Sequence, residues 1–206
     1  AQDKLKDANE VLEQENSLIQ AETTQKEEEA YLQSRHRIYH EIAQEMYPCQ
    51  KRIGEILDRI SPDEEDFKEK IARVSVLNSY VKRKTNLLLL ASERETLSTQ
   101  ELFLALDESS NYLRYAGLSA TTRKPAEQEY PADQIIALYD AFEIIAEQLI
   151  GEASSLMITW NGEGLRLAAI TSHLPDKERI ILPVHYIKNE DTLYMDIIVG
   201  KDGEMA

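Results

Sequence analysis

Residues 31–60 read YLQSRHRIYHEIAQEMYPCQKRIGEILDRI, and this stretch decides the expected fold. Apolar or aromatic residues recur at every seventh position: Leu32, Tyr39, Met46, Ile53 and Ile60. A complementary seam runs beside them: Arg35, Ile42, Cys49 and Ile56. Such spacing is typical of a helix in a coiled coil or bundle. We therefore predict one long helix, which Pro48 should kink or break locally because proline lacks the N–H donor.

The flanking residues extend this helix and add a second one. Residues 1–30 carry a thinner apolar stripe, formed by Leu5, Val11, Leu12, Leu18 and Ile19, and we assign them to a coiled-coil linker. Ser61-Pro62-Asp63 should end the first helix and place Pro62 in the first turn of the next. That helix has its own seven-residue repeat: Phe67, Val74, Val81 and Leu88. Residues 31–95 thus predict a helical hairpin that buries its stripe by pairing with a second copy, as a dimeric four-helix bundle.

The pattern changes after residue 95. Ser98 and Glu101 form a capping box that opens a helix, which Gly117 ends, and residues 121–133 should form a loop. A second helix is expected over 132–151, followed by strands at 156–160, 165–170, 180–187 and 193–199. The fold class is therefore α+β, a long helix and hairpin followed by an α/β sandwich over residues 96–206.

Composition restricts the partners. The 206 residues include 23 basic and 38 acidic side chains, a net charge of −15, which disfavours nucleic acid. Cys49 is the single cysteine, so an internal disulfide and a multi-cysteine zinc site are excluded. No apolar run approaches the roughly 20 residues that span a bilayer. Since the sequence begins with Ala1 and not Met, we expect a longer protein whose N-terminal region holds the membrane anchor.

Three strings in this order of parts resemble bacterial sensor histidine kinases. They are RIYHEIAQ at residues 37–44, YVKRKTNL at 80–87, similar to a Firmicutes branch, and AFEIIAE at 141–147. The resemblance covers nearly the whole chain and implies a dimerisation and phosphotransfer hairpin followed by a sandwich of the ATPase type. It further implies a homodimer, a response regulator as partner, and a place on the cytoplasmic side of the bacterial inner membrane.

In this resemblance His40 is the candidate phosphoacceptor. A neutral imidazole attacks the γ-phosphate of ATP, the neighbouring Glu41 holds the tautomer and takes the proton, and Gln44 orients water for dephosphorylation. A second register puts Tyr39 at the phosphorylated position and leaves the site dead. A third interpretation makes His40 a solvated histidine beside the bundle core.

The ATPase-like part departs from the family pattern. The four-residue step from Glu147 reaches Gly151, where the family has its Mg²⁺-binding asparagine, so both are degenerate ATP-site positions. The segment 171–175 lacks the Asp-x-Gly-x-Gly loop, and no glycine-rich phosphate loop precedes the last strand. Without these groups phosphoryl transfer loses its electrostatic support. We therefore expect no cofactor, and ATP with Mg²⁺ only if the kinase is active.

The sequence also contains a pair of histidines and a short basic string. His36 and His40 lie one helical turn apart, a geometry that zinc accepts, but no third ligand is indicated and no metal is expected. Residues 82–84, Lys-Arg-Lys, suggest a solvated face or a contact for an acidic response regulator.

The sequence thus favours the signalling portion of a sensor histidine kinase with impaired ATP use. Two alternatives stay open: an active autokinase that phosphorylates His40, and a non-catalytic coiled-coil scaffold with a peptide-binding sandwich.

Overall fold

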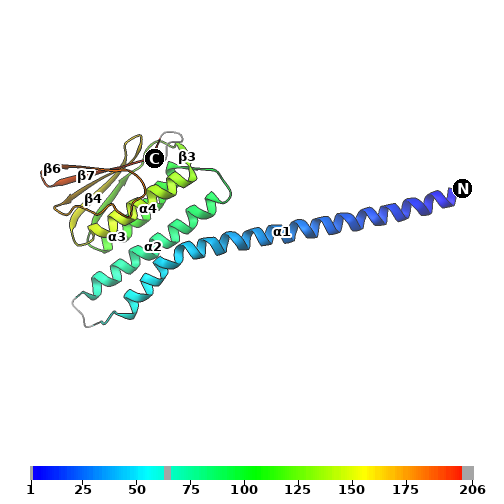
Figure 1. The fold of residues 1–206 in the computed structure, drawn as a ribbon, viewed down its shortest axis with the longest axis horizontal. Coiled ribbons are helices and arrows are strands. Elements are labelled where there is room, and N and C mark those ends of the chain that lie inside the picture. Colours follow the sequence, from blue (N-terminus) through cyan, green and yellow to red (C-terminus); the bar gives the residue numbers. More distant parts are fainter. Residues whose placement is uncertain (1, 63–65, 201–206) are drawn as a thin grey trace. The chain divides into compact units, whose positions relative to one another are not determined.

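The structure, a computed structural model, describes residues 2–62 and 66–200 (Figure 1). The chain divides into two compact units, residues 1–45 and 46–206, and each is described by itself. Helix α1, Gln2–Asp58, contributes to both units. The predicted positions Leu5, Val11 and Asp63 lie outside the residues whose side chains are described. None of the described helices combines the length and the apolar character needed to cross a membrane.

The first unit consists of helix α1 alone. Its apolar side chains remain largely exposed, among them Leu18, Leu32 and Tyr39. Of the two outcomes predicted for Pro48, a kink or a local break, the break is wrong, because α1 continues as a helix through Pro48 to Asp58. The division between the two units falls just before this proline, between Glu45 and Met46.

The second unit begins with the end of α1 and with helix α2, Phe67–Ala91. The two helices share a small apolar cluster of Ile53, Val74 and Leu77, flanked by Cys49, Ile56 and Val81. The prediction that Pro62 lies in the first turn of α2 is wrong, because this helix starts at Phe67, after the N-cap residue Asp66. Pro62 lies instead in a turn, where its fixed φ is equally favourable.

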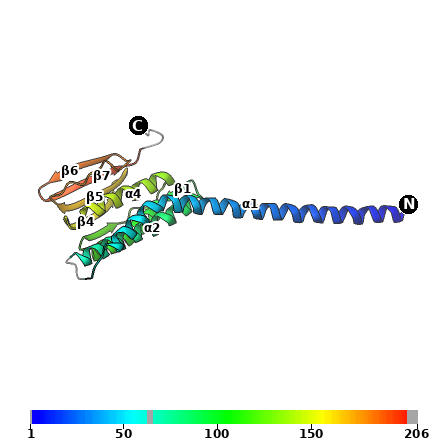
Figure 2. The ribbon, with the colours of Figure 1, turned by 60° about the horizontal axis from the view of Figure 1, so that its bottom comes forward.

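A five-stranded sheet with the order β2-β4-β5-β7-β6 forms one outer layer of this unit (Figure 2). The strands are β2 Ser119–Arg123, β4 Ala153–Trp160, β5 Gly164–Thr171, β6 Val184–Asn189 and β7 Thr192–Ile198. Strands β2 and β4 pair in parallel, and the other neighbours pair antiparallel. Two short strands, β1 Thr96–Ser98 and β3 Glu129–Pro131, form a separate antiparallel pair.

Helices α3, Thr99–Tyr115, and α4, Ala132–Leu149, join one face of the sheet in a single hydrophobic core. Alternate residues of the strands point into it, such as Leu165, Leu167 and Ala169 of β5, which are fully buried. From the other side α2 adds Val76 and Leu87 to the same core. The sandwich therefore has three layers: sheet, helix pair, and hairpin helix.

The α+β class is confirmed, and so is the capping box, in which Ser98 and Glu101 exchange side-chain and backbone hydrogen bonds. The loop predicted over 121–133 is wrong, because β2 and β3 fall partly within it. Edge strand β2 is mostly polar, and β3 has only three residues, so neither shows a hydrophobic alternation. Strand β6 begins at Val184 and not at residue 180, since Pro183 has no N–H to donate to a ladder.

Candidate functional site

The candidate phosphoacceptor His40 lies on the first unit's helix and is exposed. Its Nε2 lies 3.0 Å from the Nε2 of Gln44, one turn further along α1. Because the amide N–H₂ can only donate, a neutral imidazole in this arrangement keeps its proton on Nδ1. Glu41 lies beside it with an oxygen 3.9 Å from Nε of Arg37. The structure thus brings His40 and Gln44 together, while Glu41 pairs with Arg37.

Tyr39 does not pack into a core. It is 47% exposed, and its hydroxyl accepts a 2.6 Å hydrogen bond from Arg35. The Arg35 guanidinium also lies 5.4 Å from the centre of the Tyr39 ring, a cation–π distance. The register that gives Tyr39 the phosphorylated position stays a prediction.

The degenerate ATP-site positions Glu147 and Gly151 belong to the second unit. Glu147 lies near the end of α4 and accepts a 2.8 Å hydrogen bond from Nη1 of Arg52 on α1. Helix α4 ends at Leu149, so Gly151 is not helical and has a left-handed φ of 81° in the following turn. The two positions therefore share no helix face, because the chain has already turned away at Ile150.

The basic string 82–84 contacts acids of its own chain. Lys82 Nζ lies 2.9 Å from an oxygen of Glu108 on α3, and Arg83 pairs with the same carboxylate. Lys84 is only 6% exposed and lies 2.8 Å from Oδ2 of Asp140 on α4. The expectation of a solvated face is therefore wrong for Lys84, which ties α2 to α4.

A buried polar network connects α2, α3 and α4 next to this ion pair. The Tyr80 hydroxyl donates to Asp140 at 3.0 Å, and Ser109 Oγ lies 2.9 Å from the Tyr139 hydroxyl. Ser109 also donates to the carboxyl of Glu143 at 2.5 Å. Burial raises the pKa of Glu143 from 4.5 to about 7, and it raises the pKa of Tyr80 and Tyr139 as well.

We did not single out this network from the sequence, although a signal is present. Asp140, Glu143 and Glu147 are spaced by three and four, so they share one face of α4. That face is the one turned toward the hairpin, since its acids bond Arg52, Tyr80 and Lys84. An acidic stripe inside an otherwise apolar helix indicates partners of opposite charge.

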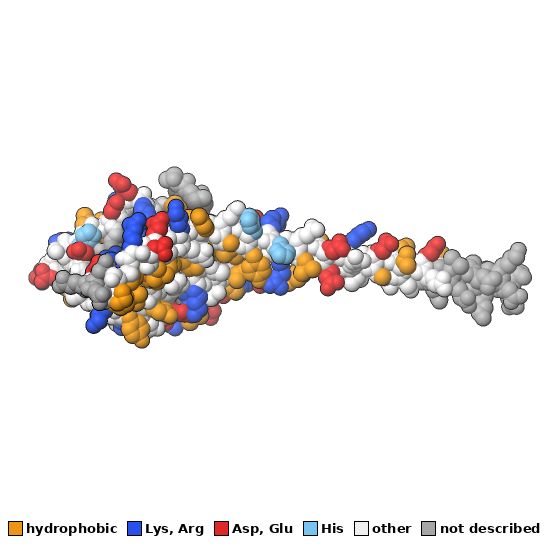
Figure 3. Space-filling view, turned by 90° about the horizontal axis from the view of Figure 1, so that it is seen from below, with side chains coloured by type: hydrophobic (Ala, Val, Ile, Leu, Met, Phe, Trp, Pro, Cys, Tyr) orange, Lys and Arg blue, Asp and Glu red, His pale blue; other side chains and the backbone are white. Residues whose placement is uncertain are grey.

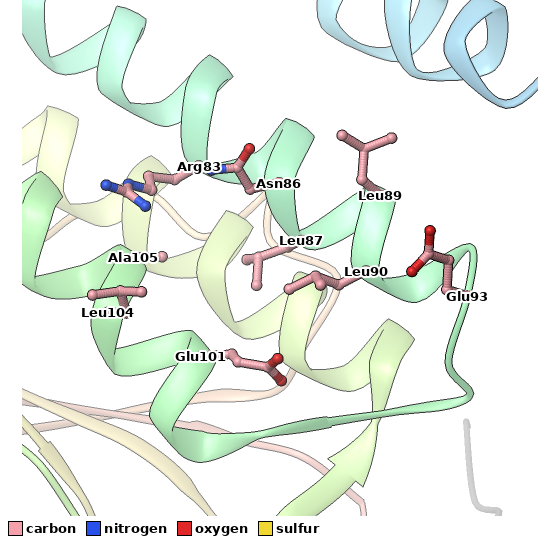
Figure 4. Close-up of a pocket in the computed structure, with 9 residues that line it drawn as sticks. All are labelled: Arg83, Asn86, Leu87, Leu89, Leu90, Glu93, Glu101, Leu104 and Ala105. Atoms are coloured by element: carbon pink, nitrogen blue, oxygen red, sulfur yellow. The ribbon is translucent and has the colours of Figure 1, made fainter. Parts of the chain in front are cut away.

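The hollow between α2 and α3 is apolar (Figure 4). It has a volume of about 370 Å³, and Leu87, Leu90 and Leu104 point toward it. Glu93 and Glu101 stand at its margin. It offers neither glycine backbone nor a set of free cations for phosphates. Among the described residues no group of three or more His, Cys, Asp or Glu could hold a metal ion.

No family model matches the sequence, and no curated protein matches it. Solved structures that are similar to the chain include the following two. The histidine kinase domain of the blue-light activated histidine kinase from Erythrobacter litoralis EL346 is 9% identical, with a TM-score of 0.40 over 73% of this chain and 95% of its own. The Acinetobacter baumannii histidine kinase AdeS is 15% identical, with a TM-score of 0.34 over 79% and 98%. Both of the solved structures named here are bacterial histidine kinases.

Proposed function

We propose that this chain is the signalling portion of a two-component sensor of the histidine kinase type, with a sandwich domain that does not use ATP. One observation supports the proposal that the sandwich domain does not use ATP. The acidic face of α4, which would have to approach Mg²⁺ and phosphate, is bonded to the hairpin through Arg52–Glu147 and Lys84–Asp140. Residues 172–183 contain no glycine and form neither helix nor strand.

Electrostatics supports the same conclusion. A triphosphate needs backbone N–H groups, cations or a bound metal to balance its charge. Here the carboxyl groups of Asp140, Glu143 and Glu147 line one helix face, and the nearby cations already neutralise carboxylates. A phosphate placed on this face would meet like charge and would have to break these ion pairs.

The proposal includes a homodimer on the membrane's cytoplasmic side, anchored through a preceding region and signalling to a response regulator. Its parts are a linker at 1–30, a dimerisation hairpin at 31–95, and an ATPase-like domain at 96–206. Hydrophobic side chains are exposed on the face in Figure 3, and the hairpin leaves Tyr47, Leu57 and Ile71 exposed. Pairing of two hairpins would bury such residues.

An active autokinase is the second candidate, and the geometry of His40 favours it. The imidazole is exposed and held by Gln44, as a phosphoacceptor must be reachable and oriented. In this alternative ATP with Mg²⁺ would bind to the sandwich and His40 would take the γ-phosphate.

Phosphate incorporation from radiolabelled ATP with Mg²⁺ separates the two candidates. We expect the wild-type chain, His40→Gln and His36→Gln all to remain at background, because the sandwich lacks the groups that hold the nucleotide. His36 is the matched control, an exposed histidine one turn before His40. Label on the wild type that is lost in His40→Gln and kept in His36→Gln would overturn the proposal and establish the autokinase.

A further inference from the structure

The carboxyl of Glu143 on α4 lies between α3, from which Ser109 donates to it, and α2, whose Tyr80 it influences. Its side chain is buried, and Ser109 of α3 donates to it at 2.5 Å. The Tyr139 hydroxyl lies 2.9 Å from the same Ser109 oxygen, and the Tyr139 ring stacks on Tyr80 of α2 with centroids 5.8 Å apart. Three helices therefore meet around one buried acid.

Titratable and charged groups face Glu143 from every helix packed around it. Tyr139, Asp140 and Glu147 lie on the same helix as Glu143, and Ser109 of α3 donates to it. The charge of Glu143 also acts on Tyr80 of α2 and on Cys49 of α1. Lys84 of α2, Arg52 of α1 and Glu108 of α3 lie next to these groups. Lys84 is bonded to Asp140 and Arg52 to Glu147, so both cations already balance another carboxylate. An ionised Glu143 would add a third negative charge to this buried face.

We propose that the Glu143 cluster is a pH-sensitive latch that holds α2 on α4 when the carboxyl is protonated and loosens this contact when it ionises. The protonated carboxyl is neutral and fits the apolar surroundings, while the ionised form is favoured by exposure to water. Burial, followed by the neighbouring charges of Glu147 and Asp140, raises the pKa of Glu143 to about 7, so the change falls near neutral pH. The latch requires neither nucleotide nor phosphate and does not rest on the proposed function.

Hydrogen exchange tests the latch on the full chain. Protection of amides 80–87 and 140–147, corrected for intrinsic exchange, gives the fraction of time in which the contact is open. A pKa of about 7 in the closed state against 4.5 in the open state predicts a roughly tenfold rise in opening between pH 6 and pH 8. Amides of β5 serve as an internal reference, because their strand pairs with β4 and β7 and not with α2 or α4.

Three variants make the result specific. Glu143→Gln keeps the shape and removes the titration, so its opening should not change between pH 6 and pH 8. Glu152→Gln removes the same charge at an exposed site and should keep the tenfold rise. Ser109→Ala removes a hydrogen bond that lowers the pKa of Glu143, so the rise should move to higher pH.

The latch is contradicted if opening in the wild type is independent of pH, or if Glu143→Gln shows the same rise as the wild type. It is also contradicted if Ser109→Ala loosens the contact equally at all pH values without moving the midpoint. This last variant keeps the test decisive even if Glu143→Gln folds poorly.

Discussion

Reversing one buried charge, by Lys84→Glu, is expected to lower the free energy of unfolding of the 46–206 unit by about 3–5 kcal/mol. Lys84 is 6% exposed and lies 2.8 Å from Asp140. A glutamate there would place a second carboxylate against Asp140 with Glu143 close by, out of water and without the cation. Urea unfolding followed by circular dichroism measures the loss.

Two further variants show whether the pair itself is responsible. Lys82→Glu is the matched control, since Lys82 is exposed and pairs with Glu108 on the surface, and we expect a loss below about 1 kcal/mol. The double variant Lys84→Glu with Asp140→Lys restores opposite charges and should recover part of the stability. Equal losses for Lys84→Glu and Lys82→Glu would show that the buried pair does not hold α2 to α4.

The second large effect concerns pH. Because the folded-state pKa of Glu143 is raised from 4.5 to about 7, the folded state binds more protons than the unfolded state between these values. Stability must therefore fall as pH rises through this window, by about 3 kcal/mol, and become constant above it. Urea unfolding of the wild type and of Glu143→Gln from pH 4.5 to pH 8 measures the difference between the two chains.

We expect the two chains to converge near pH 4.5 and Glu143→Gln to be the more stable at pH 8. Asp196 acts in a different window, because its bidentate bond from Arg166, at 2.7 Å for each contact, lowers its pKa. Its contribution is lost only as pH falls through that lowered value, below the Glu143 window. Parallel curves for wild type and Glu143→Gln would show that Glu143 is not held protonated.

The long helices and the main strands could be predicted from the sequence because their patterns are local. The seven-residue spacing marks α1 and α2, and the capping box of Ser98 and Glu101 marks the start of α3. Strands β2 and β3 could not be found in this way. Among the described strands β2 pairs with β4 alone, and its mostly polar residues are understood as a strand once that pairing is known.

In the candidate site, too, local contacts could be predicted from the sequence and tertiary contacts could not. The closeness of His40 and Gln44 follows from helical spacing, which the structure reproduces at 3.0 Å. The partners of Lys84 and Glu143 depend on tertiary contacts across 56 and 34 positions of sequence. A basic string and an acidic stripe each look solvated alone, and their charges are paired only when α1, α2, α3 and α4 pack against one another.

Binding of ATP tests the central claim most directly. Calorimetry should use the purified chain, Mg²⁺ and a non-hydrolysable ATP analogue, with an active histidine kinase as the positive control. We predict no heat of binding at millimolar ligand, because the acidic face of α4 is bonded to the hairpin and the chain between β5 and β6 has no glycine. Binding at micromolar affinity would contradict the account and would make His40 the first residue to test for phosphorylation.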